Sequence, residues 1–218
     1  MRLVMRLFAV AAVFAAGACS SSSRASAGMP PSSRDSAAAQ AARADSVRNS
    51  YTPADVEFMT GMIHHHAQAL VMSRMAPSHG ASGPLQIMAE RIIVGQNDEI
   101  TLMQRWLRER NEPVPEPAPA GMDMAMHGAD HAMHMPGMLS PAQLEELDAA
   151  RGPEFERLFL TYMIQHHQGA ITMVDDLFNS YGAGQGDAIF KLASDIAADQ
   201  SSEIARMQSM LREMMLGP

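Results

Sequence analysis

The stretch FMTGMIHHHAQALVM occupies residues 58–72, and a closely similar stretch, FLTYMIQHHQGAITM, occupies residues 159–173. A second pair follows, QNDEITLMQRWL at residues 96–107 and QSSEIARMQSML at residues 200–211. Within each pair the shared residues keep the same spacing, so the sequence predicts one domain built from a duplicated unit. Both copies keep His, Glu and Met at positions where an ordinary core would use Leu. This combination indicates metal handling.

Helix signals frame these four stretches. Thr52 and Pro53 form a typical helix start, because Thr is a good N-cap and Pro suits the first helical position. Ser140 opens a capping box that should begin a short helix. No alternating strand pattern is present, so we expect an all-α protein in which two helical hairpins pack as a four-helix bundle. The expected long helices run from about residue 53 to 75, from about 84 to 110, from about 153 to just before Gly182, and from about 187 to 215.

The histidine doublets fall on the stripe that such a bundle buries. His65 and His166 keep the spacing of four and three residues that marks a core-facing helix position, whereas His66 and His167 are rotated by about 100°. Spacing alone leaves open which histidine of each doublet would bind a metal. The complementary helices carry Glu and Met on one face. The candidate metal ligands are therefore His65, His66, His166, His167, Met62, Met163, Met72, Met173, Glu99, Glu203, Met103 and Met207.

A metal-free reading competes with this one. A layer of hydrogen-bonded His and Glu side chains could fix the register of the helices without any ion. We place metal binding ahead of it because thioether beside imidazole is a ligand set for soft metals.

The segment between the two repeats carries a second Met/His group. It begins with alternating prolines and then loses all periodicity, so its methionines are not expected in a core. Thioether and imidazole groups there would suit Cu(I) or Ag(I). The candidate capture residues are Met122, Met124, Met126, His127, His131, His134 and Met135.

The beginning of the chain is typical of an exported lipoprotein. Basic residues precede a short apolar run, and small residues precede Cys19, the single cysteine. We expect lipid attachment at Cys19 and a position on the periplasmic face of the envelope, with the outer membrane favoured; ordinary secretion is the alternative. The formal net charge of −8 argues against nucleic acid as a partner. The expected organisation is a signal peptide at 1–18, a lipidated tether at 19–51, repeat 1 at 52–111, a linker at 112–140, and a short helix with repeat 2 at 141–218.

The twice-repeated Met-Ile-x-His-His-x-x-Ala and Gln-x-x-Glu-Ile-x-x-Met motifs resemble the domain-of-unknown-function 305 family. The resemblance covers about residues 52 to 216 apart from the linker. It implies a ferritin-like four-helix fold, export and, for some members, copper and silver handling. By position it carries a binding role to His65, His66, Met62 and Met72 in the first copy and to His166, His167, Met163 and Met173 in the second. His64 stands where the second copy has Gln165, so it is an extra histidine.

We therefore predict a cell-envelope protein that sequesters or relays copper, with Cu(I) favoured over Ag(I), and that can form homo-oligomers. Two alternatives remain at this point. A ferritin-like metal-dependent oxidase is the weaker, because the Glu-x-x-His motif of di-iron bundles is missing from both histidine stretches. A metal-free structural bundle is the other.

Overall fold

A computed structural model describes residues 36, 38–40, 50–118 and 135–216. The expected signal peptide, Cys19 and most of the tether lie outside the described residues, as do the capture residues from Met122 to His134. Within the described ranges the chain is all-helical and contains no strand. No helix there is long and apolar enough to cross a membrane.

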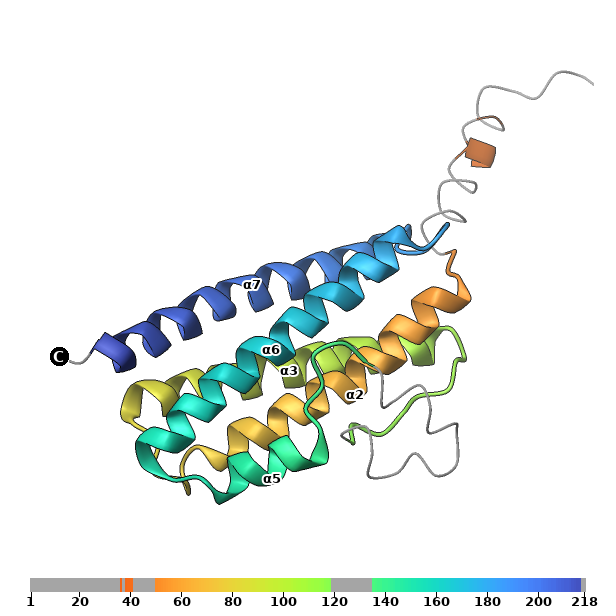
Figure 1. Cartoon of the computed structure of the whole chain (residues 1–218). Coiled ribbons are helices and arrows are strands. Elements are labelled where there is room, and N and C mark those ends of the chain that lie inside the picture. The colour runs from red at the N-terminus through yellow and green to blue at the C-terminus, as the bar shows by residue number, and fades with distance from the viewer. Residues whose placement is uncertain (1–35, 37, 41–49, 119–134, 217–218) are drawn as a thin grey trace, which may run out of the picture. The chain divides into compact units, whose positions relative to one another are not determined.

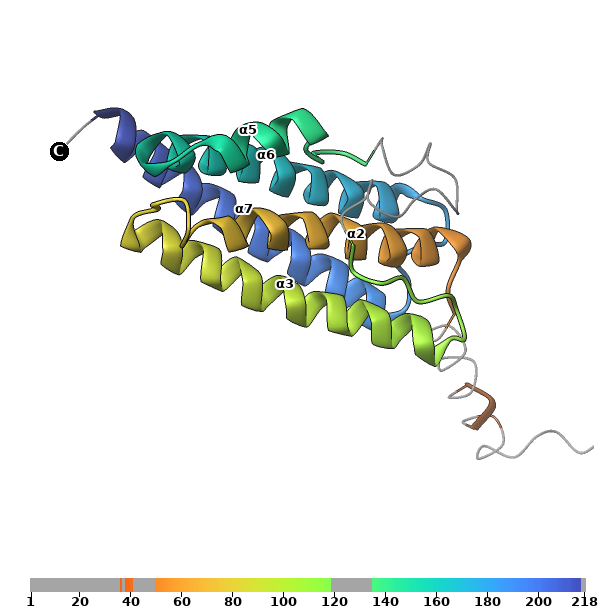
Figure 2. The same ribbon diagram turned by 90° about the horizontal axis from the view of Figure 1, so that it is seen from below.

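Four long helices form a bundle: α2 (Pro53–Met75), α3 (Gly83–Glu109), α6 (Gly152–Asn179) and α7 (Asp187–Leu216). A short helix, α5 (Pro141–Ala149), precedes α6. Helix α2 packs along α3, and α6 packs along α7. The two hairpins meet mainly through α2 and α6, so the fold is the expected ferritin-like four-helix bundle of two duplicated hairpins (Figures 1 and 2). The short α5 lies against α2 and α6.

The predicted helix start at Thr52 is confirmed. The Thr52 hydroxyl accepts a hydrogen bond from the Asp55 amide, and the Asp55 carboxylate accepts one from the Thr52 amide at 2.6 Å. The second carboxylate oxygen of Asp55 accepts from the Gly184 amide, also at 2.6 Å. One buried Asp therefore caps α2 and ties it to the turn between α6 and α7. The capping box at Ser140 is also present and begins α5.

The apolar core is divided into two clusters, and each holds three of the candidate methionines. Along α2, Met62 belongs to one cluster and Met72 to the other, with His65 and His66 between them in the sequence. The duplication relates the methionines of the two clusters: Met62 is equivalent to Met163, Met72 to Met173, and Met103 to Met207, and each cluster contains one member of every pair. We call Met62, Met103 and Met173 the first methionine cluster, and Met72, Met163 and Met207 the second methionine cluster.

Candidate metal centre

Four histidines form a buried layer where the two hairpins meet. His65, His66, His166 and His167 are each 0% exposed. The rings of His65 and His166 face each other across the contact between α2 and α6, with 3.9 Å between their centroids. The spacing argument anticipated the burial of His65 and His166. It did not anticipate that the other member of each doublet is equally buried.

A carboxylate holds the second histidine of each doublet. His66 Nε2 lies 2.7 Å from Glu99 Oε2, and His167 Nε2 lies 2.7 Å from Glu203 Oε2. These pairs join α2 to α3 and α6 to α7, so each hairpin carries one His–Glu pair. A carboxylate that accepts from Nε2–H leaves Nδ1 as the nitrogen with a free lone pair in a neutral ring.

The first histidines of the doublets are bound differently. His65 Nε2 donates to the backbone carbonyl of Pro136 at 3.0 Å. Within residues 50–118 and 135–216, neither ring nitrogen of His166 has a hydrogen-bond partner. The described residues also provide no partner for Nδ1 of His65, His66 or His167. An unpaired buried polar atom costs about 1–3 kcal/mol. Without a bound ligand, the unpaired nitrogens of this layer therefore lower the free energy of unfolding.

Burial favours the neutral form of three of these imidazoles, those of His65, His166 and His167. It lowers the pKa of His65 to about 3, with the neighbouring His66 as the second cause. It also lowers the pKa of His166 well below the usual value, and nearby His65 acts in the same direction. The pKa of His167 is lowered by burial as well, although Glu203 opposes the shift. Neutral imidazole is the form that binds metals, because its second nitrogen carries a lone pair.

Thioethers are the other candidate donors in the core of the bundle. Met62, Met72, Met103, Met163 and Met207 are each 0% exposed, and Met173 is partly buried. No three His, Cys, Asp or Glu side chains in the described part of the chain are grouped so that they could hold a metal ion. An ion bound here would therefore need sulfur as well as imidazole, which favours a soft ion of low coordination number.

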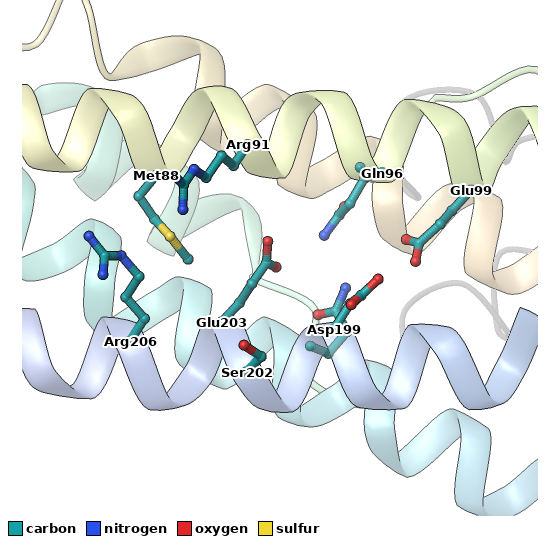
Figure 3. A pocket seen from close by; sticks show the side chains of 10 residues that line it. Met88, Arg91, Gln96, Glu99, Asp199, Ser202, Glu203 and Arg206 are labelled. Atoms are coloured by element: carbon teal, nitrogen blue, oxygen red, sulfur yellow. The ribbon is translucent and has the colours of Figure 1, made fainter.

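Glu99 and Glu203 also line a pocket of about 250 Å³ between α3 and α7. Figure 3 shows Gln96 and Asp199 among the side chains that line it. Gln96 is 2% exposed and both of its amide atoms lack a partner. The pKa of Asp199 is raised by partial burial and then by the charges of Glu99 and Glu203. The sequence motifs pointed to Gln96 but gave no sign of Asp199, which only the packing of α7 opposite α3 places here.

Comparison with known proteins gives one family match. The family model described as Domain of unknown function (DUF305) matches residues 55–211. Among curated proteins, none matches this sequence.

Solved structures of that family share the fold. A DUF305 fragment from Deinococcus radiodurans is 29% identical, with a TM-score of 0.62 over 75% of this chain and 98% of its own. A DUF305 protein from Streptomyces coelicolor that is thought to be secreted is 26% identical, with a TM-score of 0.62 over 74% of this chain and 93% of its own.

The structure of CopM in its Cu(I)-bound form is also similar to this chain. It is 28% identical, with a TM-score of 0.56 over 73% of this chain and 96% of its own. CopM has also been solved in Cu(II)-bound and Ag-bound forms.

Proposed function

The chain belongs to the Domain of unknown function (DUF305) family, and from that premise we propose that it binds copper, as Cu(I), and Ag(I) as its soft analogue. Its role would be to sequester or relay the ion in the cell envelope, after export and lipid attachment at Cys19. The copper-bound and silver-bound forms of CopM support this ion class.

One observation carries the proposal: the hydrogen bonds that these buried histidines make to the described residues all go to acceptors. Glu99, Glu203 and the Pro136 carbonyl each take the N–H of one ring. No donor in the described residues reaches the other nitrogen of any of these rings. The arrangement fixes the tautomer and leaves lone pairs unused, which is how carboxylates orient metal-binding histidines in other proteins.

The ligand set would combine these nitrogens with the flanking thioethers. His65 and His166 belong to it because their rings face each other, and His66 and His167 because Glu99 and Glu203 orient them. Met62, Met173 and Met103 would contribute from one core cluster, and Met72, Met163 and Met207 from the other. Glu99 and Glu203 would act as orienting partners and not as ligands.

The test separates ion binding from a structural histidine layer. In His166→Leu, an unpaired polar ring is replaced by an apolar side chain of similar size. We expect the metal-free variant to be as stable as the original protein or up to about 1–3 kcal/mol more stable in urea denaturation. We also expect it to lose most of its Cu(I) affinity in competition with a colorimetric chelator under reducing conditions.

A matched control uses His79, a buried histidine outside the layer. Both of its ring nitrogens have partners, Ser78 on one side and Asp148 on the other. His79→Leu should therefore reduce stability and leave Cu(I) affinity unchanged. If His166→Leu is destabilising and binds Cu(I) as well as the original protein, the layer is structural and the proposal is wrong.

A further inference from the structure

The segment that leads from the linker into α5 lies directly on the histidine layer. We call residues 135–139 the strap. Gln68 of α2 holds its far end through two hydrogen bonds, one donated to the Leu139 carbonyl at 3.1 Å and one accepted from the Leu139 amide at 2.8 Å. The Pro136 carbonyl in the middle of the strap accepts from His65. The strap therefore touches a proposed metal-binding histidine through its own backbone.

Glycine lets the strap approach α6 this closely. A Cβ atom on Gly169 would lie 2.0 Å from the Pro136 oxygen and 2.6 Å from the Gly137 Cα. Gly137 itself has a φ of 76°, which a residue with a side chain rarely adopts. The position of the strap is thus fixed by backbone packing, and the side chain of Met135 is placed accordingly.

Met135 and Met173 share the space above Gly61. A Cβ atom built on Gly61 would lie 3.5 Å from Met135 Sδ and 3.3 Å from Met173 Cε. In the second repeat the residue equivalent to Gly61 is Tyr162, whose ring would fill such a space. The absence of a side chain at Gly61 therefore brings a thioether of the strap beside a thioether of the first methionine cluster.

The preceding segment is also anchored to this part of α2. His64 Nδ1 donates to the Ala118 carbonyl at 2.8 Å. Ala118 and Met135 are distant in the sequence, yet they contact α2 at His64 and Gly61, within one turn of helix.

The second methionine cluster has a different cover. Leu139 and Leu147 pack into the apolar core around it, and Leu144 of α5 packs against that core. Tyr162, which replaces Gly61 here, bonds to Glu146 of α5. Apolar side chains and a tyrosine therefore seal one end of the duplicated site, whereas a methionine from the linker side covers the other.

We propose that Met135 and Met173 together form a loading site for soft monovalent cations above Gly61, from which ions reach the histidine layer beside the first methionine cluster. This inference rests on the proposed function and adds a direction to it. The ligands are two thioethers, so the site would take Cu(I) or Ag(I) and not hard cations such as Mg²⁺ or Ca²⁺.

The experiment is an Ag(I) titration followed by NMR, in the full chain labelled with ¹³C at the methionine methyl carbons. Ag(I) is the probe because it undergoes no redox change. Leu variants assign the signals of Met135 and Met173. We expect these two signals to shift together at the first substoichiometric additions, before those of the second methionine cluster. Met135→Leu should abolish the early shift of Met173. Met210→Leu, a partly buried methionine packed elsewhere, is the matched control and should change nothing.

Uptake kinetics provide the second measurement. We expect Met135→Leu and Met173→Leu each to slow Ag(I) uptake from a weak chelator several-fold. The double variant should be no slower than the slower single variant, since two ligands of one site are not additive. Additive effects, or an early Met173 shift that persists in Met135→Leu, would overturn the loading site. If the loading site fails in this way but His166→Leu still loses Cu(I) binding as expected, the proposed function stands without the loading site. If the original protein takes up no Ag(I), both the loading site and the proposed function are wrong.

Discussion

Acid should destabilise the metal-free protein at a pH where most of its carboxylates are still ionised. His65, His166 and His167 have lowered pKa values in the folded state because they are buried. In the unfolded chain each would titrate near 6.5. Below that pH the unfolded state binds protons that the folded state does not. The free energy of unfolding is therefore highest above about pH 6.5 and falls as the pH drops toward the folded-state pKa values.

The size of the effect follows from linkage. Between about pH 7.5 and about pH 5.5, one histidine that stays neutral when folded loses about 1.4 kcal/mol of stability. His65 and His166, whose folded-state pKa values lie well below this range, together lose about 3 kcal/mol, which is a large part of the 5–15 kcal/mol that holds a typical domain together. His167 adds a smaller loss, because Glu203 opposes the lowering of its pKa. For His65 the loss should continue down to a pH of about 3.

Urea denaturation followed by circular dichroism at several pH values measures this loss directly. His166→Leu removes one of the two groups with the most strongly lowered pKa values, so its pH dependence should be shallower by about one third to one half. His79→Leu, which removes a histidine with partners on both nitrogens, provides the comparison. A free energy of unfolding that stays constant between about pH 7.5 and about pH 5.5 would refute the view that these rings are held neutral by burial.

Three further substitutions test other parts of the structure. Glu203→Gln should weaken Cu(I) binding by about 10–100-fold in chelator competition while the fold is retained, because it removes the charge that orients His167; unchanged affinity would contradict the orienting role. Asp55→Ala should lower the melting temperature by an amount that corresponds to about 1–3 kcal/mol, since it removes the N3 carboxylate of the capping box and leaves the Thr52 and Gly184 amides without their acceptor; Cu(I) affinity should not change. Gly169→Ala should displace the strap, because its Cβ would meet the Pro136 oxygen at 2.0 Å; mass spectrometry should detect faster hydrogen exchange of the Leu139 amide, and unaltered exchange would show that the strap is not held by this contact.

Local signals were enough to predict the helices. The Thr52 cap, the box at Ser140 and the glycines between α6 and α7 act over a few residues, and the observed bounds agree with the expected ones to within about two residues. The inward direction of His65 and His166 followed from periodicity for the same reason. The division of the whole chain into leader, tether, repeats and linker remains a prediction.

The periodicity of the sequence could not predict contacts between residues that are far apart along the chain. Gln68 reads as one more polar residue on α2, yet it binds Leu139, which lies 71 positions away. The strap has no repeat and no regular spacing, so nothing local indicates where it packs. The alignment of the two repeats nevertheless held a signal. The residue equivalent to Gly61 in the second repeat is Tyr162, and the residue equivalent to Gly169 in the first repeat is Gln68, so each glycine replaces a large side chain.

The buried histidines of this protein fall into two kinds, and the difference argues against a purely structural layer. His79 has an acceptor or donor at both ring nitrogens, as expected for a histidine that only holds the turn between α2 and α3 against α5. In the layer, the described part of the chain gives His65, His66 and His167 acceptors only and gives His166 no partner. A structural layer would gain stability from a donor at each remaining nitrogen. The same chain satisfies both nitrogens of His79, and duplication has twice preserved the incomplete pattern, so the unused lone pairs are best explained by a cation that takes the place of the missing donors.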